Sequence, residues 1–177
     1  GRRQRQMCIR DRLRAKHRGP DMPVPVLVGS WNTIEGLVRE YSPAARTLVE
    51  AFWPGGLSLV VNQAPSLPWN LGDTAGTVML RMPLHPIAIE ILRRTGPMAV
   101  SSANISGQAP ATNAVRAKQM LGGEAAVYVD GGEATIGTPS TIVDISTPVP
   151  RILREGAVSA AAVAEVLSTT PERLLGQ

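Results

Sequence analysis

A short apolar run that breaks into a loop of small polar residues is the feature that most limits the fold of this chain. Residues 98–100 are apolar and predict a buried strand, and the segment Ser-Ser-Ala-Asn-Ile-Ser-Gly at 101–107 follows at once. Ser102 and Asn104 offer hydrogen-bond donors without bulk, and Gly107 can adopt backbone angles that other residues avoid. Open α/β sheets bind ligands where strands end in loops, so the segment predicts a binding loop. An ordinary turn would use the same residues.

The remaining pattern predicts strands and helices that alternate irregularly, which favours a mixed α/β sheet over a regularly wound one. Strands are expected at residues 24–28, 57–61, 77–82, 98–100, 126–130, 140–144 and 152–153. Helices are expected at residues 33–38, 43–52, 86–95, 112–121 and 159–167. Ser42 and Pro43 suit the start of the second helix, Asn32 or Thr33 the start of the first, and Gly96 the end of the third. Ile87, Ile91 and Leu92 of the third helix are expected to point inward.

The positive charge of the chain belongs to its first residues. The formal net charge is +4, but eight of the 18 lysines and arginines lie in residues 1–18, against one acid, Asp11. From residue 19 onward, ten basic and thirteen acidic residues leave a net charge of −3. A basic leader of this kind is either a solvated or disordered segment or a contact for nucleic acid.

Several function classes are disfavoured by composition. Aromatic residues make up 3% of the chain, which argues against a base-stacking surface for single-stranded nucleic acid. One cysteine, Cys8, and two histidines argue against a disulfide framework or a protein-only zinc site. The sequence has no Walker A, Gly-x-Gly-x-x-Gly or Gly-x-Ser-x-Gly motif, and no membrane-spanning run or signal peptide. We expect a cytoplasmic protein. If it binds a nucleotide, lysine, arginine and hydroxyl groups must hold the phosphates.

A few charged residues stand where a ligand would explain them. Lys16 and Arg18 are separated by one residue before a proline-rich strand, so both could reach one polyphosphate, although they also simply continue the basic leader. Arg81 is a cation within an apolar strand and needs a partner, either a structural carboxylate or an anionic ligand. His85 fits a helix cap better than a catalytic base.

Taken together and in this order, the motifs resemble the YrdC family of threonylcarbamoyl-AMP synthases. The matching segments are Lys16-x-Arg18, Trp-Pro-Gly-Gly-Leu-Ser-Leu-Val at 53–60, residues 77–86, residues 97–107, Ser-Thr-Ile-Val-Asp at 140–144 and Ile-Leu-Arg-Glu-Gly-Ala at 152–157. The resemblance covers residues 14–168. It implies a single α/β domain with a twisted mixed sheet that lines a basic cavity.

The resemblance also implies an activity and a set of site residues. The activity is condensation of L-threonine, bicarbonate and ATP with Mg²⁺ to threonylcarbamoyl-AMP and pyrophosphate, a nucleotidyl transfer that feeds t6A modification of tRNA through downstream transfer proteins. Catalytic roles around the phosphates are implied for Lys16, Arg18, Ser102 and Asn104. Nucleotide contacts are implied for Arg18, Met22, Thr77, Ser102, Pro110 and Arg154, and threonine contacts for Arg81, Val100 and Ser140.

The chain departs from the family's pattern in three places. Met22 stands where many relatives have a nucleotide-contacting asparagine, and Leu27 where many have a threonine-binding histidine. The family normally opens with a strand and a Pro-Thr-(Asp/Glu)-Thr-x-Tyr-Gly-Leu-Gly loop, whereas this chain opens with the basic leader. We therefore expect an N-terminally truncated synthase with residues 1–12 as a disordered or non-native leader, 13–170 as the YrdC-like domain and 171–177 as a tail. Without that loop, the chain would lack some threonine and nucleotide contacts.

Two other readings remain on the residues alone. One is an RNA-binding or ribosome-associated module without catalysis, in which the leader contacts RNA; its affinity would fall steeply with salt. The other is a carbamoyl-transfer domain related to hydrogenase maturation factors, against which the lack of zinc-finger cysteines argues.

Overall fold

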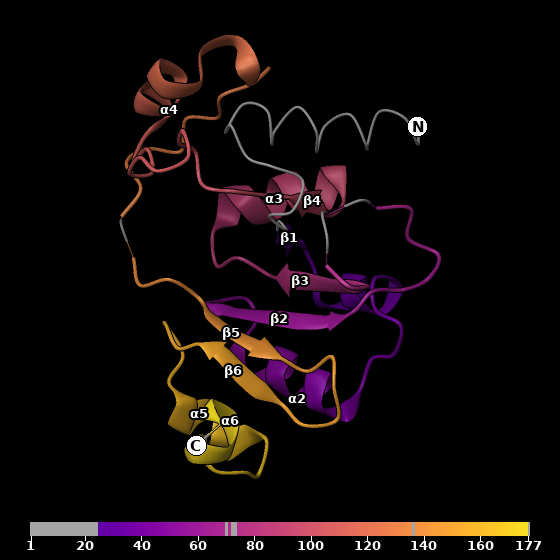
Figure 1. Ribbon diagram of the computed structural model, residues 1–177. Helices are drawn as coiled ribbons and strands as arrows, with labels where there is room; N and C mark the ends of the chain where they lie inside the picture. The colour runs from indigo at the N-terminus through magenta and orange to yellow at the C-terminus, as the bar shows by residue number, and fades with distance from the viewer. Residues whose placement is uncertain (1–24, 70, 72–73, 136, 177) are drawn as a thin grey trace. The chain divides into compact units, whose positions relative to one another are not determined.

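The computed structural model describes residues 25–69, 71, 74–135 and 137–176 (Figure 1). Its strands are β1 (Val26–Leu27), β2 (Leu57–Asn62), β3 (Thr77–Arg81), β4 (Met98–Ala99), β5 (Thr141–Asp144) and β6 (Arg151–Arg154). They form one mixed sheet in the order β4-β1-β3-β2-β5-β6. β2 runs antiparallel to β3 and parallel to β5, and β5 runs antiparallel to β6. The mixed α/β sheet expected from the sequence is confirmed.

The α-helices are α2 (Pro43–Phe52), α3 (Pro86–Thr95), α4 (Ala114–Leu121), α5 (Ala160–Val166) and α6 (Pro171–Leu175), and two 3₁₀ turns are η1 (Trp31–Gly36) and η2 (Gly122–Glu124). Helix α2 begins as predicted, because Ser42 Oγ accepts a hydrogen bond from the Ala45 amide and Pro43 follows it. His85 caps α3 through Nδ1, as expected, and Gly96 ends that helix with a positive φ of 79°.

The core of the sheet lies on the face made by alternate residues of its central strands. Leu57 and Leu59 of β2 and Leu80 of β3 are fully buried, as strand alternation requires. Leu48 of α2 and Val163 of α5 are equally buried, and these two helices contact each other. The opposite face of the same strands carries Ser58 and Arg81 together with apolar residues such as Val60 and Met79.

The sequence-based prediction fails at four places. Residues 126–130 belong to none of the six strands of the described sheet, and Val127 and Val129 are 75% and 57% exposed, because alternation alone cannot supply a paired neighbour. Residues 171–175, expected within a tail, form α6, and Leu174 on it is buried. The first turn is capped by neither Asn32 nor Thr33, because it is a 3₁₀ turn that starts at Trp31, before both residues. Ile87, expected inward, is 41% exposed.

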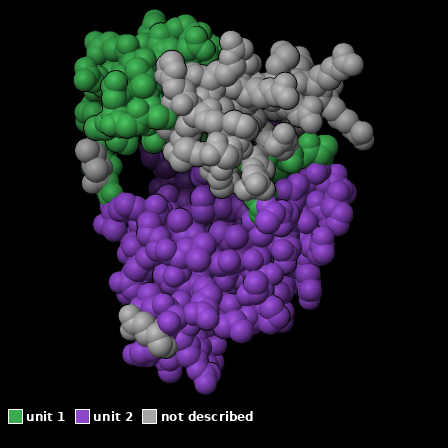
Figure 2. All heavy atoms as spheres, viewed as in Figure 1, with its two compact units in different colours: residues 1–24, 68–74, 99–137 green, residues 25–67, 75–98, 138–177 purple. Residues whose placement is uncertain are grey.

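The described residues group into two compact units (Figure 2). We call Pro25–Leu67, Ala75–Met98 and Thr138–Gln177 the sheet unit. The described residues of Pro68–Thr74 and Ala99–Gly137 make up the loop unit. Each unit is considered by itself below. In the part of the chain that the structure describes, no helix is both long enough and apolar enough to cross a membrane.

Candidate anion-binding site

Four polar residues of the sheet unit lie on one face of four adjacent segments, and we call them the arginine–serine row: Ser58, Arg81, Ser140 and Arg154. In the strand register, Ser58 of β2 is opposite Ile142 of β5, and Ile142 is opposite Arg154 of β6. Residues opposite each other on paired strands point to the same face, and Ser140, two residues before Ile142, points there as well.

Arg81 joins the row from the other side of β2. The register between β2 and β3 pairs Leu59 with Leu80. If this antiparallel register is continued by one residue, Ser58 lies opposite Arg81. Leu27 of β1 is opposite Arg81. This leucine, which stands where a histidine was expected from the resemblance, therefore lies beside the row.

Ser140 is the centre of the hydrogen bonds in the row. Arg154 donates from Nε and Nη2 to the Ser140 carbonyl oxygen, at 3.0 and 2.8 Å, and from Nη2 to Ser140 Oγ at 3.2 Å. The hydroxyls of Ser58 and Ser140 are 2.9 Å apart. Both serines are buried, with 3% and 8% exposure, so these contacts fix one guanidinium and two hydroxyls against the sheet.

Arg81 has a backbone partner in place of the carboxylate that a buried cation could use. Its Nε donates to the Gly55 carbonyl oxygen at 2.9 Å. Burial lowers the pKa of the Arg81 guanidinium, and the nearby charge of Arg154 lowers it further. Within the described residues, the one ion pair is Arg94–Glu90 on the surface of α3. A bound anion would relieve the repulsion between Arg81 and Arg154.

The turn that holds Gly55 is fixed from both sides. Trp53 is buried, and its Nε1 donates to the Leu57 carbonyl oxygen at 2.8 Å. The Gly55 amide donates to the carbonyl oxygen of Met82, and Gly56 accepts from the Thr141 amide, both at 2.9 Å. The glycine-rich turn therefore ties β3 to β5 at the row.

Thr141 fixes the segment that follows Arg154. Its hydroxyl donates to the Val158 carbonyl oxygen and accepts from the amides of Val158 and Gly156, at 3.0 and 2.9 Å. Thr141 is fully buried. Gly156 has to be a glycine, because a Cβ there would lie 2.1 Å from the Pro139 carbonyl oxygen. These contacts set the distance between β6 and residue 140.

The structure brings some of the predicted site residues together. Arg81, Ser140 and Arg154 form the row. Thr77 lies at the opposite end of β3 from Arg81, about 13 Å away along the strand. Ser58 and Thr141 were inside matching motifs but had no predicted role. A serine within the apolar run of β2 is the signal that would have singled out Ser58.

Other predicted residues belong to the loop unit: Val100, Ser102, Asn104 and Pro110. The side-chain amide of Asn104 donates to the carbonyl oxygens of Ile105 and Gln108, at 3.1 and 2.6 Å. Gly107 inside this loop has a φ of +86°. Asn104 thus shapes the loop, and both of its amide hydrogens are engaged. Lys16, Arg18 and Met22, and the leader at 1–12, lie outside the described residues.

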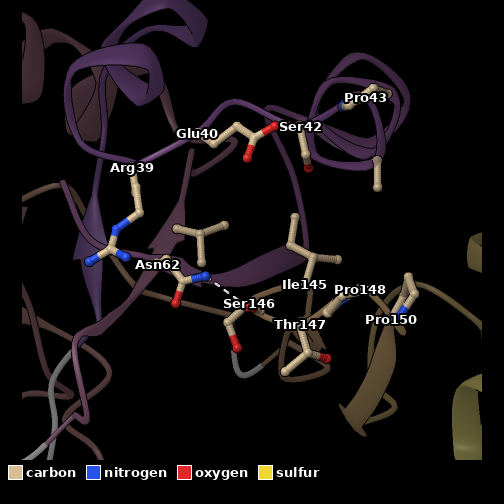
Figure 3. Close-up of a pocket in the computed structure, with 12 residues that line it drawn as sticks. Arg39, Glu40, Ser42, Pro43, Asn62, Ile145, Ser146, Thr147, Pro148 and Pro150 are labelled. Atoms are coloured by element: carbon tan, nitrogen blue, oxygen red, sulfur yellow. Dashed lines mark hydrogen bonds between the residues drawn. The ribbon is translucent and has the colours of Figure 1, made fainter.

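A separate cavity of about 320 Å³ lies at the far end of β2, beside Asn62 and the start of α2 (Figure 3). Among its lining residues, Asn62 donates to the Ser146 carbonyl oxygen, and Ser146 donates to Asp144. None of the predicted site residues lines it. Across the described residues, no group of three or more His, Cys, Asp or Glu could hold a metal ion.

The row suits an anionic ligand, and comparisons with known proteins identify relatives of the chain. The family model Sua5/yciO/yrdC, described as telomere recombination, matches residues 4–156. A protein of Mycobacterium tuberculosis (strain ATCC 25618 / H37Rv) is 60% identical over 164 residues, which are 93% of this chain and 76% of that protein. The threonylcarbamoyl-AMP synthase of Bacillus subtilis (strain 168) is 38% identical over 150 residues, 82% of this chain and 42% of that protein.

A solved structure gives the same result at the level of the fold. The crystal structure of Pyrococcus abyssi Sua5 complexed with L-threonine superposes with a TM-score of 0.84 at 31% identity. It covers 93% of this chain, which in turn spans about half of that protein (49%).

Proposed function

The chain belongs to the Sua5/yciO/yrdC family, and from this premise we propose that it is a threonylcarbamoyl-AMP synthase domain. The proposed reaction condenses L-threonine, bicarbonate and ATP to threonylcarbamoyl-AMP and pyrophosphate, a nucleotidyl transfer for t6A modification of tRNA in the cytoplasm. The observation that carries the proposal is the arginine–serine row, because a guanidinium group and a buried hydroxyl on one face of the sheet suit the carboxylate of an amino acid.

The proposed chemistry needs little from a strong base. The threonine amine adds to CO₂ supplied by bicarbonate and loses a proton, which gives a carbamate. A carbamate oxygen then attacks the α-phosphorus of ATP, and the bond to pyrophosphate breaks. Such a phosphoryl transfer depends mainly on positioning and on neutralising negative charge.

Roles follow from this arrangement. Arg81 and Ser140 hold the threonine carboxylate, and Arg154 steadies Ser140 while its remaining donors face a phosphate. We assign the remaining nucleotide and phosphate contacts, by family resemblance, to Lys16, Arg18, Thr77, Ser102, Asn104 and Pro110. Mg²⁺ bound to the ATP phosphates would neutralise part of their charge.

The test measures pyrophosphate release from ATP, with and without L-threonine and bicarbonate. It compares the unchanged chain with Arg81→Ala and with Arg94→Ala, a control that removes an exposed arginine from α3. We expect release that requires both substrates. Arg81→Ala should lower kcat/KM for threonine about 100-fold, because a charged hydrogen bond to the substrate is lost. Arg94→Ala should leave it unchanged.

Two results would contradict the proposal. Pyrophosphate release that is independent of threonine would point to a different nucleotide reaction. No binding of L-threonine by the folded chain, measured by calorimetry, would remove the role of the arginine–serine row.

A further inference from the structure

Two buried serine hydroxyls from distant parts of the chain face each other in the row. Ser58 and Ser140 are 82 residues apart in the sequence, and their Oγ atoms are 2.9 Å apart. A hydroxyl has one proton and two lone pairs, so the direction of this hydrogen bond decides which serine keeps a proton for a ligand. The neighbouring contacts determine that direction.

Arg154 restricts what Ser140 can do. Its Nη2 can only donate, so the contact at 3.2 Å occupies one lone pair of Ser140 Oγ. If Ser140 then donated its proton to Ser58, the Ser58 proton would need another acceptor. Within the described part of the chain, Ser140 is the side-chain partner of Ser58, and Ser58 is 3% exposed. That arrangement would leave a buried donor unsatisfied, which is costly.

The reverse arrangement gives the proton of Ser58 an acceptor and leaves without one only the proton of Ser140, the more exposed of the two serines. When Ser58 donates to Ser140, the two lone pairs of Ser140 Oγ are filled by Ser58 and Arg154. The proton of Ser140 then remains for a ligand. Arg154 contacts this hydroxyl, and Arg81 is near enough to Arg154 for their charges to interact, so the two cations favour an anionic acceptor for the Ser140 proton.

We propose that Ser58 is a positioning residue, which makes the Ser140 hydroxyl a hydrogen-bond donor to the carboxylate of threonine. The inference rests on the proposed function, since it names the substrate group that Ser140 addresses. Ser58 touches no substrate and acts through Ser140. Its effect therefore disappears when Ser140 has no hydroxyl.

The experiment is a double-mutant cycle on threonine binding, measured by calorimetry with L-threonine and with L-threoninol, which lacks the carboxylate. Ser58→Ala should weaken threonine binding about tenfold and leave threoninol binding nearly unchanged. The double variant with Ser140→Ala should bind threonine no more weakly than Ser140→Ala alone, because the two residues act as one unit. Ser58→Thr keeps the hydroxyl and should bind threonine like the unchanged chain.

A matched control removes a hydroxyl pair elsewhere in the sheet unit. Ser30 Oγ lies 3.0 Å from Thr33 Oγ1, so Ser30→Ala breaks the same kind of contact outside the row. It should not change threonine binding. If Ser58→Ala does not fold, Ser58→Cys, a weaker donor of similar size, should still lower the affinity for threonine and spare threoninol.

The outcomes separate this inference from the proposed function. Unaltered threonine affinity in Ser58→Ala, an equal loss for threoninol, or losses that add in the double variant would each overturn the inference alone. Absence of threonine binding by the unchanged chain would overturn both.

Discussion

Thr141 and Val158 are joined by two hydrogen bonds: the Thr141 hydroxyl donates to the Val158 carbonyl oxygen and accepts from the Val158 amide. The same hydroxyl accepts from the Gly156 amide. One buried side chain therefore satisfies three backbone groups of the segment after β6. The segment carries no regular structure of its own, and its position relative to Ser140 depends on this contact.

Replacement of Thr141 should show how much this contact contributes. Thr141→Val keeps the shape of the side chain but leaves two amides without their acceptor. We therefore expect the free energy of unfolding, measured in urea, to fall by about 3 kcal/mol. Thr141→Ser keeps the hydroxyl and loses one buried methyl, for a loss of about 1 kcal/mol. Equal losses for the two variants would mean that the methyl, and not the hydroxyl, holds the segment.

Gly156 is the second requirement of this segment. Gly156→Ala puts a methyl group against the backbone of residues 139 and 140, which cannot move aside without disturbing β5. We expect a loss of at least about 2 kcal/mol in the free energy of unfolding. Gly36→Ala is the control, since a Cβ at that position has open space. A thermal unfolding series would contradict the argument if both variants melted alike.

Helix α6 belongs to the packed core of the sheet unit. Leu174 is 1% exposed, whereas its neighbour Leu175 is 42% exposed. Leu174→Ala should therefore cost about 3 kcal/mol through the cavity it leaves, and Leu175→Ala less than about 1 kcal/mol. Denaturant titration of both variants measures the difference. Similar midpoints would show that residues 171–175 act as a tail after all.

A pH-dependent contact supports the start of α4 in the loop unit. Asn113 caps the helix by accepting from the Arg116 amide, and its side-chain nitrogen donates to Glu133. This bond and one from Thr112 lower the pKa of Glu133 below its ordinary value of 4.5. A carboxyl with a lowered pKa in the folded state stabilises above its ordinary value, and the contribution disappears as the pH falls through the lowered value.

The corresponding measurement is hydrogen exchange of the Arg116 and Ala117 amides, which both donate to Asn113. We expect exchange to be slow near pH 6 and to accelerate, relative to the intrinsic rate, as the pH falls well below 4.5. Glu133→Gln should give the fast exchange already at pH 6. Glu124→Gln, at an exposed acid in η2, is the control and should leave protection unchanged.

The sequence was sufficient wherever a signal is local. The start of α2 follows from Ser42 and Pro43, and the cap of α3 from His85 before Pro86. The start of α6 has the same kind of signal in Thr170 and Pro171, which the interpretation as a tail overlooked. The strand predicted at residues 126–130 is wrong for a different reason, since alternation of apolar and polar residues does not indicate which strand would pair with them.

The residues of the site also differ in whether the sequence alone could indicate them. A charged residue in an apolar strand singled out Arg81, because burial of a cation requires a partner wherever that partner lies. The pairing of Ser58 with Ser140 depends on the register between β2 and β5, which the composition of neither strand reveals. The roles of Thr141 and Gly156 likewise require knowledge of which backbone groups approach each other.

The placement of the row across paired strands also bears on how such a domain can change in length. Ser58, Arg81 and Arg154 stand at one level of the sheet, so residues can be inserted into the connections at 63–76 or 145–150 without separating them. A single-residue deletion inside β2 would instead turn Ser58 to the opposite face and bring a leucine into the row. Length variation within this fold should accordingly be tolerated between the strands and rejected within them.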